Sequence, residues 1–213
     1  MNGQFTRIGG YAGLVGACAM FAGDMLFYGH LGTGGDALTS SLQIVRQSAP
    51  QRLVMGGLTS IIGGFGYALG AFHIYGQMSV RPAWLRLCVA GAFLLIAIIS
   101  TATHAVWGSF ALTVLAGSSG AALVANYMAA YFLIGAIIGM PASLLLAVAI
   151  FRRLTNWPMW FAGISPGGLY FLLSNATYLP APLGAPIVGG AFNLAFAMFF
   201  VTSIAISRLR SRS

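Results

Sequence analysis

The hydrophobic positions of this chain fall into long blocks instead of alternating with polar positions. Six blocks reach the roughly 20 residues that a helix needs to cross the hydrocarbon core of a bilayer. They lie near residues 8–30, 53–77, 84–107, 124–151, 158–178 and 186–207. The pattern predicts an all-α integral membrane protein, in which residues 1–213 form a single transmembrane domain built as a bundle of six helices.

The connections between the blocks carry three further signals. Residues 31–51 place apolar side chains at helical spacing behind Asp36, a good N-cap residue, and so predict a short amphipathic helix on the outer surface. Residues 108–123 mix glycine and serine with an apolar core, which fits either an extension of the third helix or a dip into the outer interface. The Ser-Pro-Gly-Gly sequence of residues 165–168 predicts an interruption of the fifth block.

Composition supports the membrane assignment and sets an orientation. Only 6% of the residues are charged, whereas a soluble domain carries about 25%. The ten cations are all arginines at the ends of blocks, not in a patch that would bind nucleic acid, so no nucleic-acid partner is expected. An N-terminus on the inside puts eight arginines on that side (Arg7, Arg81, Arg86, Arg152, Arg153, Arg208, Arg210, Arg212) and two outside (Arg46, Arg52). This bias predicts cytoplasmic termini in a multi-pass protein of the bacterial plasma membrane, the cell inner membrane.

Glycine spacing indicates how the helices pack. Small residues four apart let two helices approach closely, and van der Waals contact holds helices together in lipid. Three such glycine pairs occur, at Gly9/Gly13, Gly66/Gly70 and Gly135/Gly139. The second block holds four further glycines, which predicts a central place in the bundle, and glycine-rich faces of this kind could also join copies into a homo-oligomer.

The candidate chemistry begins with Asp24, one of only two acidic residues in the chain. A carboxylate inside a membrane span is costly and points to a functional role. Because each helical residue advances about 1.5 Å, the depth of every polar residue follows from the orientation. Polar residues of five blocks share one level in the outer half: Asp24 and Tyr28, Ser100 and His104, Asn126 and Tyr131, Asn175, and Asn193.

These residues predict a membrane-embedded enzyme or binding protein for a lipophilic small molecule. An aspartate beside an imidazole fixes its tautomer and raises its basicity, so Asp24 and His104, with Tyr28 on the same face as Asp24, are the catalytic candidates. The reaction would be of an isomerase, cyclase or hydrolase type. The candidates for substrate binding are Asn175, Asn193, Asn126, Tyr131 and Ser100.

Other interpretations of the same residues stay open. Asp24 could instead pair with Arg52 at the outer interface, and His104 could bond to a backbone carbonyl. His73 and the four tryptophans fit interface positions. No metal and no cofactor are predicted, although His30 and His104 are weak metal candidates and haem is the alternative cofactor.

Two other functional classes are also open. A transporter or channel would need a polar path, yet the inner half offers only His73 and Gln77. A structural subunit would need only the glycine-rich packing.

Overall fold

The computed structural model describes residues 3–28, 45–79, 83–179, 187 and 189–210, and these are helical almost throughout. The elements in chain order are α1 (Gly3–Tyr28), α3 (Pro50–Gln77), α4 (Ala83–Leu115), α5 (Ala121–Phe151), η1 (Met159–Ile164), α6 (Pro166–Ser174), η2 (Asn175–Tyr178) and α8 (Ala191–Arg210). Within the described residues, five helices are long and apolar enough to cross a membrane, namely α1, α3, α4, α5 and α8. The chain is therefore an all-helical protein of multi-pass membrane type.

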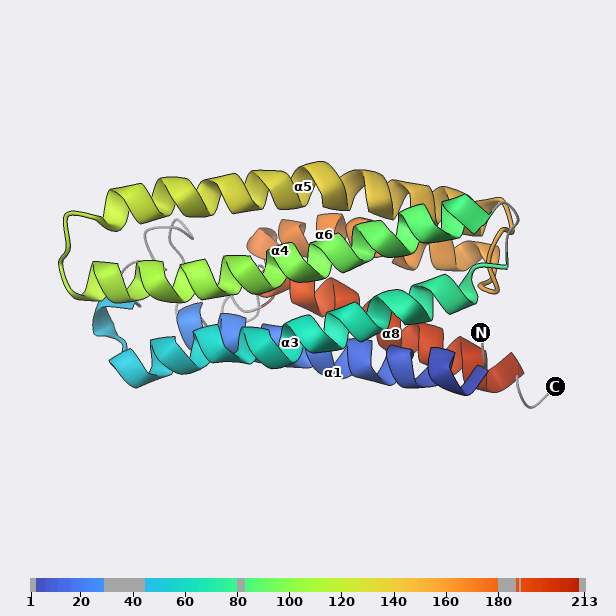
Figure 1. Cartoon of the computed structure of the whole chain (residues 1–213), viewed down its shortest axis with the longest axis horizontal. Coiled ribbons are helices and arrows are strands. Elements are labelled where there is room, and N and C mark those ends of the chain that lie inside the picture. Colours follow the sequence, from blue (N-terminus) through green and yellow to red (C-terminus); the bar gives the residue numbers. More distant parts are fainter. Residues whose placement is uncertain (1–2, 29–44, 80–82, 180–186, 188, 211–213) are drawn as a thin grey trace.

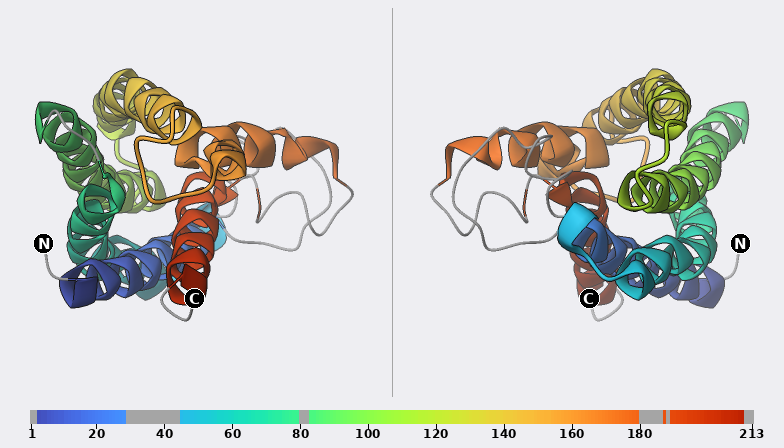
Figure 2. Two further views of the ribbon diagram at one scale, coloured as in Figure 1. Left: turned by 90° about the vertical axis from the view of Figure 1, so that its right-hand side faces the viewer. Right: turned by 90° about the vertical axis from the view of Figure 1, so that its left-hand side faces the viewer.

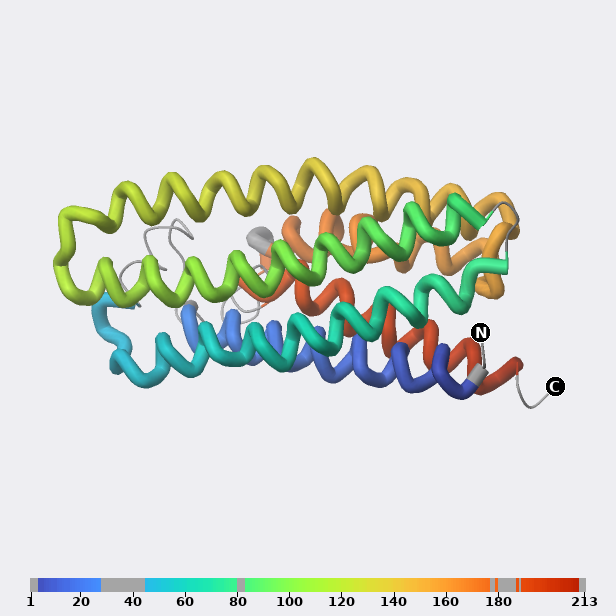
Figure 3. Tube along the Cα trace, viewed as in Figure 1, coloured from blue at the N-terminus to red at the C-terminus, as the bar shows by residue number. Residues whose placement is uncertain are grey.

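The long helices run side by side, and both termini lie at the same end of the bundle (Figure 1). Viewed along the bundle, each helix packs on the next in the order α1, α3, α4, α5, α6, α8 and back to α1 (Figure 2). The end that carries both termini is here called the termini end. Helices α6 and α8 occupy the half of the bundle next to this end, whereas α3, α4 and α5 continue to the opposite end (Figure 3).

The fifth predicted span is not one continuous helix. Residues 158–178 form η1, the nine-residue helix α6 and η2, and α6 at about 1.5 Å per residue is far shorter than a bilayer core. The break lies at Ser165, whose φ of −60° and ψ of 147° are extended. Its cause is Pro166, since a proline disfavours helical backbone in the residue before it. The predicted interruption is thus found at the expected place.

The two other connections are resolved in different ways. Helix α4 continues to Leu115, so residues 108–115 extend the third helix, and a turn at Gly117, with a φ of 64°, leads into α5 at Ala121. Most of the predicted amphipathic helix over residues 31–51 lies outside the described residues. Its last turn, residues 45–47, is helical, and Val45 is buried in a cluster with Phe27 and Leu53.

Helices α1 and α3 pack through backbone contact. A Cβ atom added to Gly66 would lie 2.5 Å from the Cα of Gly16 and 2.5 Å from the carbonyl oxygen of Ala12. Gly13 and Gly70 likewise leave room for the ring of Phe200 on α8. Two of the three predicted glycine pairs therefore serve packing within the chain, and α3 lies between α1 and α4.

A buried polar cluster lies near the termini end. It consists of Thr6, His73, Trp157 and Ser203 and is called the His73 network. Nδ1 of His73 lies 2.7 Å from the Thr6 carbonyl, and Nε2 lies 2.7 Å from the Ser203 hydroxyl. Because a carbonyl only accepts, Nδ1 of the neutral ring carries the hydrogen and the hydroxyl donates to Nε2. Trp157 Nε1 donates to the same hydroxyl over 2.8 Å.

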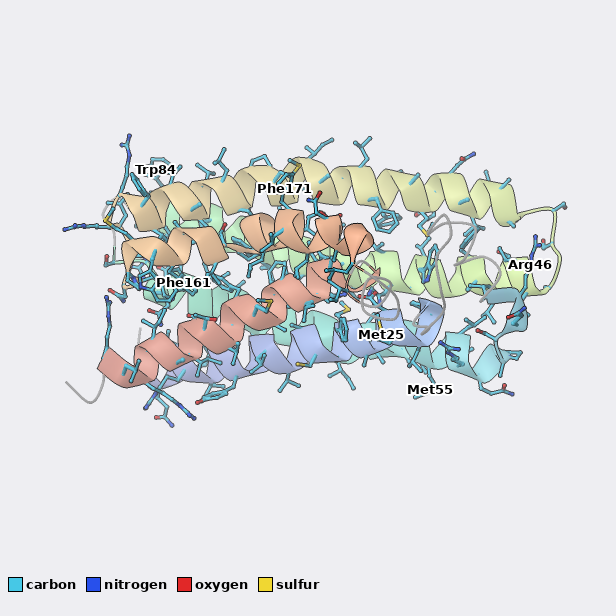
Figure 4. The ribbon with its side chains drawn as sticks, turned by 180° about the vertical axis from the view of Figure 1, so that it is seen from behind. Met25, Arg46, Met55, Trp84, Phe161 and Phe171 are labelled. Atoms are coloured by element: carbon cyan, nitrogen blue, oxygen red, sulfur yellow. The ribbon has the colours of Figure 1, made fainter. Side chains whose placement is uncertain are left out.

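The His73 network corrects two expectations from the sequence. His73 and Trp157 are only 1% and 3% exposed, so neither lies at the interface as expected. The tryptophan is drawn inward because its ring packs on Phe161 and Phe199 while its N–H finds a buried partner. Phe161 lies among the helices near the termini end, whereas Trp84 lies on the outside at that end (Figure 4).

We expect His73→Phe to lower the free energy of unfolding by about 2–4 kcal/mol, because it leaves the buried Thr6 carbonyl and Ser203 hydroxyl without their His73 partner. Reversible unfolding in mixed micelles measures this. The control is Thr202→Ala on α8, next to Ser203, whose exposed hydroxyl bonds only to the Met198 carbonyl, and it should change stability by less than about 0.5 kcal/mol. Equal stability of His73→Phe and the wild type would contradict the expectation.

Candidate functional site

Asp24 lies in the last turns of α1, buried between three other helices. Its Oδ1 is 3.1 Å from Nε2 of His104 on α4, and its Oδ2 accepts a hydrogen bond of 2.7 Å from Nδ2 of Asn193 on α8. Each carboxylate oxygen therefore has a partner from a different helix. This satisfies the rule that a buried carboxylate must be hydrogen-bonded, and it ties α1 to α4 and α8 at one point.

The cluster continues to a fourth helix through Asn193. The hydroxyl of Tyr67 on α3 donates to Oδ1 of Asn193 over 2.6 Å. These four residues are called the Asp24 network, and all are buried, with exposed fractions of 5% for Asp24, 4% for Tyr67, 7% for His104 and 3% for Asn193. Asn193 is also in the first turn of α8, so the carboxylate lies near the positive end of that helix dipole.

Gly23 makes this close approach of the helices feasible. A Cβ atom there would meet the hydroxyl of Thr59 on α3, and it would lie 3.0 Å from the Gly56 carbonyl and 3.2 Å from Cε1 of His104. The residue before Asp24 therefore has to be small for α3 and the imidazole to reach the carboxylate.

The second nitrogen of His104 is the chemically distinctive atom of the site. Nδ1 is buried, and no hydrogen-bond partner for it exists among the described residues. The imidazole packs on Phe27 with ring centroids 5.8 Å apart, and Phe27 contacts Trp107 in turn. A histidine held at one nitrogen by a carboxylate, with the other nitrogen unbonded, has the arrangement of a general acid or base.

The structure brings together three of the sequence candidates, Asp24, His104 and Asn193, and sets others apart. Asn175 is exposed, and its side chain donates to the Phe171 carbonyl of its own segment over 2.6 Å. The Tyr131 hydroxyl lies 3.1 Å from that of Tyr127 on the same helix.

Four further candidates do not join the Asp24 network. Asn126 on α5 is exposed and Ser100 on α4 is half-buried, and within the described part of the chain neither bonds to the Asp24 network. Tyr28 is the last residue of α1, but its side chain lies outside the described residues, as does His30. The candidates on α5 are distant from α1 in the packing order, because α3 and α4 lie between the two helices.

The two non-catalytic interpretations of the pair are not what the structure shows. Arg52 donates over 3.0 Å to the carbonyl of Met25, next to Asp24, where a cation complements the carboxyl end of α1. The carboxylate itself bonds to His104 and Asn193, and His104 bonds to that carboxylate instead of a backbone carbonyl. Among the described residues, no three histidine, cysteine or acidic side chains lie together as a metal site.

Sequence reasoning missed Tyr67 and three members of the His73 network, Thr6, Trp157 and Ser203. A signal for Tyr67 does exist, because the buried face of α3 follows the helical repeat Gly56, Ser60, Gly63, Tyr67, Gly70 and Ile74. A single hydroxyl-bearing ring in a stripe of small residues marks the point where this helix contributes a polar group to the core.

The chain belongs to a family of unknown function (DUF6796), which matches residues 1–209. No curated protein and no solved structure matches the chain. Any function must therefore be argued from the geometry of the site itself.

Proposed function

We propose that this member of the DUF6796 family binds a lipophilic small molecule within the membrane and moves a proton on it, with Asp24 and His104 as the acid/base pair. The observation that carries the proposal is the buried contact of 3.1 Å between the two side chains, together with the unbonded Nδ1 of His104 among the described residues. An isomerisation, a cyclisation or a hydrolysis is the kind of reaction that such a pair serves.

The roles follow from the hydrogen bonds. A carboxylate only accepts, so Nε2 of His104 donates to Asp24, and this fixes the tautomer in which Nδ1 holds the lone pair. Nδ1 takes a proton from the substrate, and the imidazolium that forms is stabilised by the negative charge of Asp24. A positioned acid/base group of this kind contributes about 10²–10⁴-fold to a rate.

The membrane setting supports a substrate that arrives from the lipid. The arginine bias supports a topology with both termini on the cytoplasmic side of a plasma membrane and with η1, α6 and η2 as an interrupted sixth crossing. In that orientation Asp24 lies in the outer half, beyond which α3, α4 and α5 continue (Figure 3). A neutral lipophile in the outer leaflet is at the right depth to reach it, and we propose no resident cofactor for the reaction.

A channel or transporter is less well supported. It would need a continuous polar path, but Phe200 packs between the two networks, against both His73 and Phe196. At the termini end, the backbone N–H of Asn156 donates to the Gln77 carbonyl over 2.7 Å. This hydrogen bond connects the segment after α5 to the end of α3. These contacts leave apolar packing, not a polar path, between the two networks, which supports a site that opens to one side only.

The test is exchange of label from water into lipids. Purified protein is incubated with a total lipid extract in water labelled with deuterium and heavy oxygen, and mass spectrometry follows deuterium in C–H positions or heavy oxygen in a hydrolysed product. We expect at least one neutral lipid to gain label, and His104→Gln to slow this by about 100-fold or more. Ser109→Ala, on an exposed part of α4, is the control that should keep the wild-type rate. Wild-type protein that labels nothing, or His104→Gln at full rate, sinks the proposal.

A further inference from the structure

The strongest unassigned feature is the hydroxyl of Tyr67, a residue that is 4% exposed, which donates its hydrogen bond to Asn193 and not to the acid/base pair. It reaches Asp24 only through Asn193, over hydrogen bonds of 2.6 and 2.7 Å. Tyrosine in the middle of a membrane helix needs a partner for its hydroxyl, but any backbone carbonyl would serve that need. Tyr67 instead bonds to the side-chain amide of Asn193, which in turn bonds to the Asp24 carboxylate, and this choice of partner requires a separate explanation.

The polarity of the Asn193 amide supplies that explanation. The amide oxygen only accepts and the amide nitrogen only donates, so a tyrosine donor at Oδ1 forces the nitrogen toward Asp24. The Asn193 amide then donates to one oxygen of the carboxylate, and His104 presents Nε2–H to the other. Without the tyrosine donor, Oδ1 of Asn193 loses the partner that it has in the described core, so the amide is no longer held in place and can turn away from Asp24, which loosens the carboxylate that faces His104.

We infer that Tyr67 is a positioning residue, which acts through the Asn193 amide to hold Asp24 and to set which nitrogen of His104 carries the proton. The inference deepens the proposed function and rests on it for the catalytic consequence: the reactive atom is Nδ1, a lone pair. The substrate must then offer an acidic proton to that atom, as a hydroxyl group or as a C–H next to a carbonyl. Tyr67 supports this geometry from outside the reacting atoms, as outer-shell partners do in other sites.

The test reads the protonation of His104 directly. The chain contains three histidines, so nitrogen NMR of protein labelled at histidine gives three sets of ring signals, each assigned by removing one histidine. In the wild type we expect His104 to show one tautomer, with the proton on Nε2. Tyr67→Phe should convert this to a mixture of tautomers and slow label exchange by about 10–100-fold. The signals of His73 should not move.

The control is Ser60→Ala, on the same buried stripe of α3, whose hydroxyl bonds only to the Gly57 carbonyl. It should leave the His104 signals unchanged. Asn193→Ala provides a second variant that removes the middle link, and it should also mix the tautomers. A single unchanged tautomer in folded Tyr67→Phe overturns the inference, and so does a failure of both variants to fold, because the network would then serve packing alone. If the tautomers mix as expected while the wild type labels no lipid, only the proposed function fails.

Discussion

Asp24→Asn is expected to reduce turnover by about 10⁴-fold, the size of effect that the same change has in serine hydrolase triads. The amide is nearly the shape of the carboxylate, so packing is preserved. Its chemistry differs at the contact with His104, since an amide N–H placed at Oδ1 would donate to Nε2. The imidazole would then carry its hydrogen on Nδ1, and the lone pair would no longer face the substrate.

The measurement is the label exchange described above, made beside a check that the variant is folded. Asp24→Asn should elute from gel filtration as the wild type does and should unfold cooperatively. The chain offers a matched control in its only other acid, because Asp36→Asn removes the same charge elsewhere and should keep full activity. Full activity of a folded Asp24→Asn protein would rule out Asp24 as the orienting carboxylate.

The depth of each polar residue along its helix could be predicted from the sequence, and this depth identified the residues at the centre of the site. The helical rise is fixed, so Asp24, His104 and Asn193 could be placed at one level from their distance to the block ends. The structure joins these three by direct hydrogen bonds. The rarity of an acid in a membrane helix was a sound guide, because a buried carboxylate has to recruit partners.

Lateral order was not predictable, and this separates the other candidates from the site. Asn126 and Tyr131 share the level of Asp24, but they lie on α5, which packs on α4 and on the interrupted segment instead of on α1. Depth says nothing of which helices are neighbours, since the neighbours are chosen by packing of whole faces. Asn175 is absent from the site for another reason: α6 ends at Ser174, and Asn175 begins a 3₁₀ turn in which its amide donates to the Phe171 carbonyl of its own segment.

Polar residues near block ends were the least predictable from sequence. His73 and Trp157 lie where side chains usually meet the membrane surface, so an interface position was expected. Their burial depends on Ser203, ten residues along α8 from Asn193, which accepts from the indole and donates to the imidazole. A single serine hydroxyl that bonds to two residues on other segments produces no periodic pattern in the sequence, so these contacts could not be predicted.

Gly66→Ala is expected to be the most disruptive single-methyl change in the bundle. The added Cβ would lie 2.5 Å from backbone atoms of α1, namely the Gly16 Cα and the Ala12 carbonyl oxygen, and backbone cannot move aside as a side chain can. The two helices would have to separate, at a cost of about 1–3 kcal/mol in the free energy of unfolding. Alanine is intrinsically the better helix former by about 1 kcal/mol, so a loss of stability here isolates the packing term.

The control is Gly91→Ala on α4, because a Cβ there would meet nothing within 4 Å. It should leave stability unchanged or raise it slightly through helix propensity. Unfolding in mixed micelles compares the two variants, and equal stability would mean that α1 and α3 do not pack as closely as described. Gly66 also precedes Tyr67, so separating α1 from α3 should pull the tyrosine hydroxyl away from Asn193. Gly66→Ala should therefore mix the His104 tautomers as Tyr67→Phe does, which links the glycine packing of α3 to the chemistry of the site.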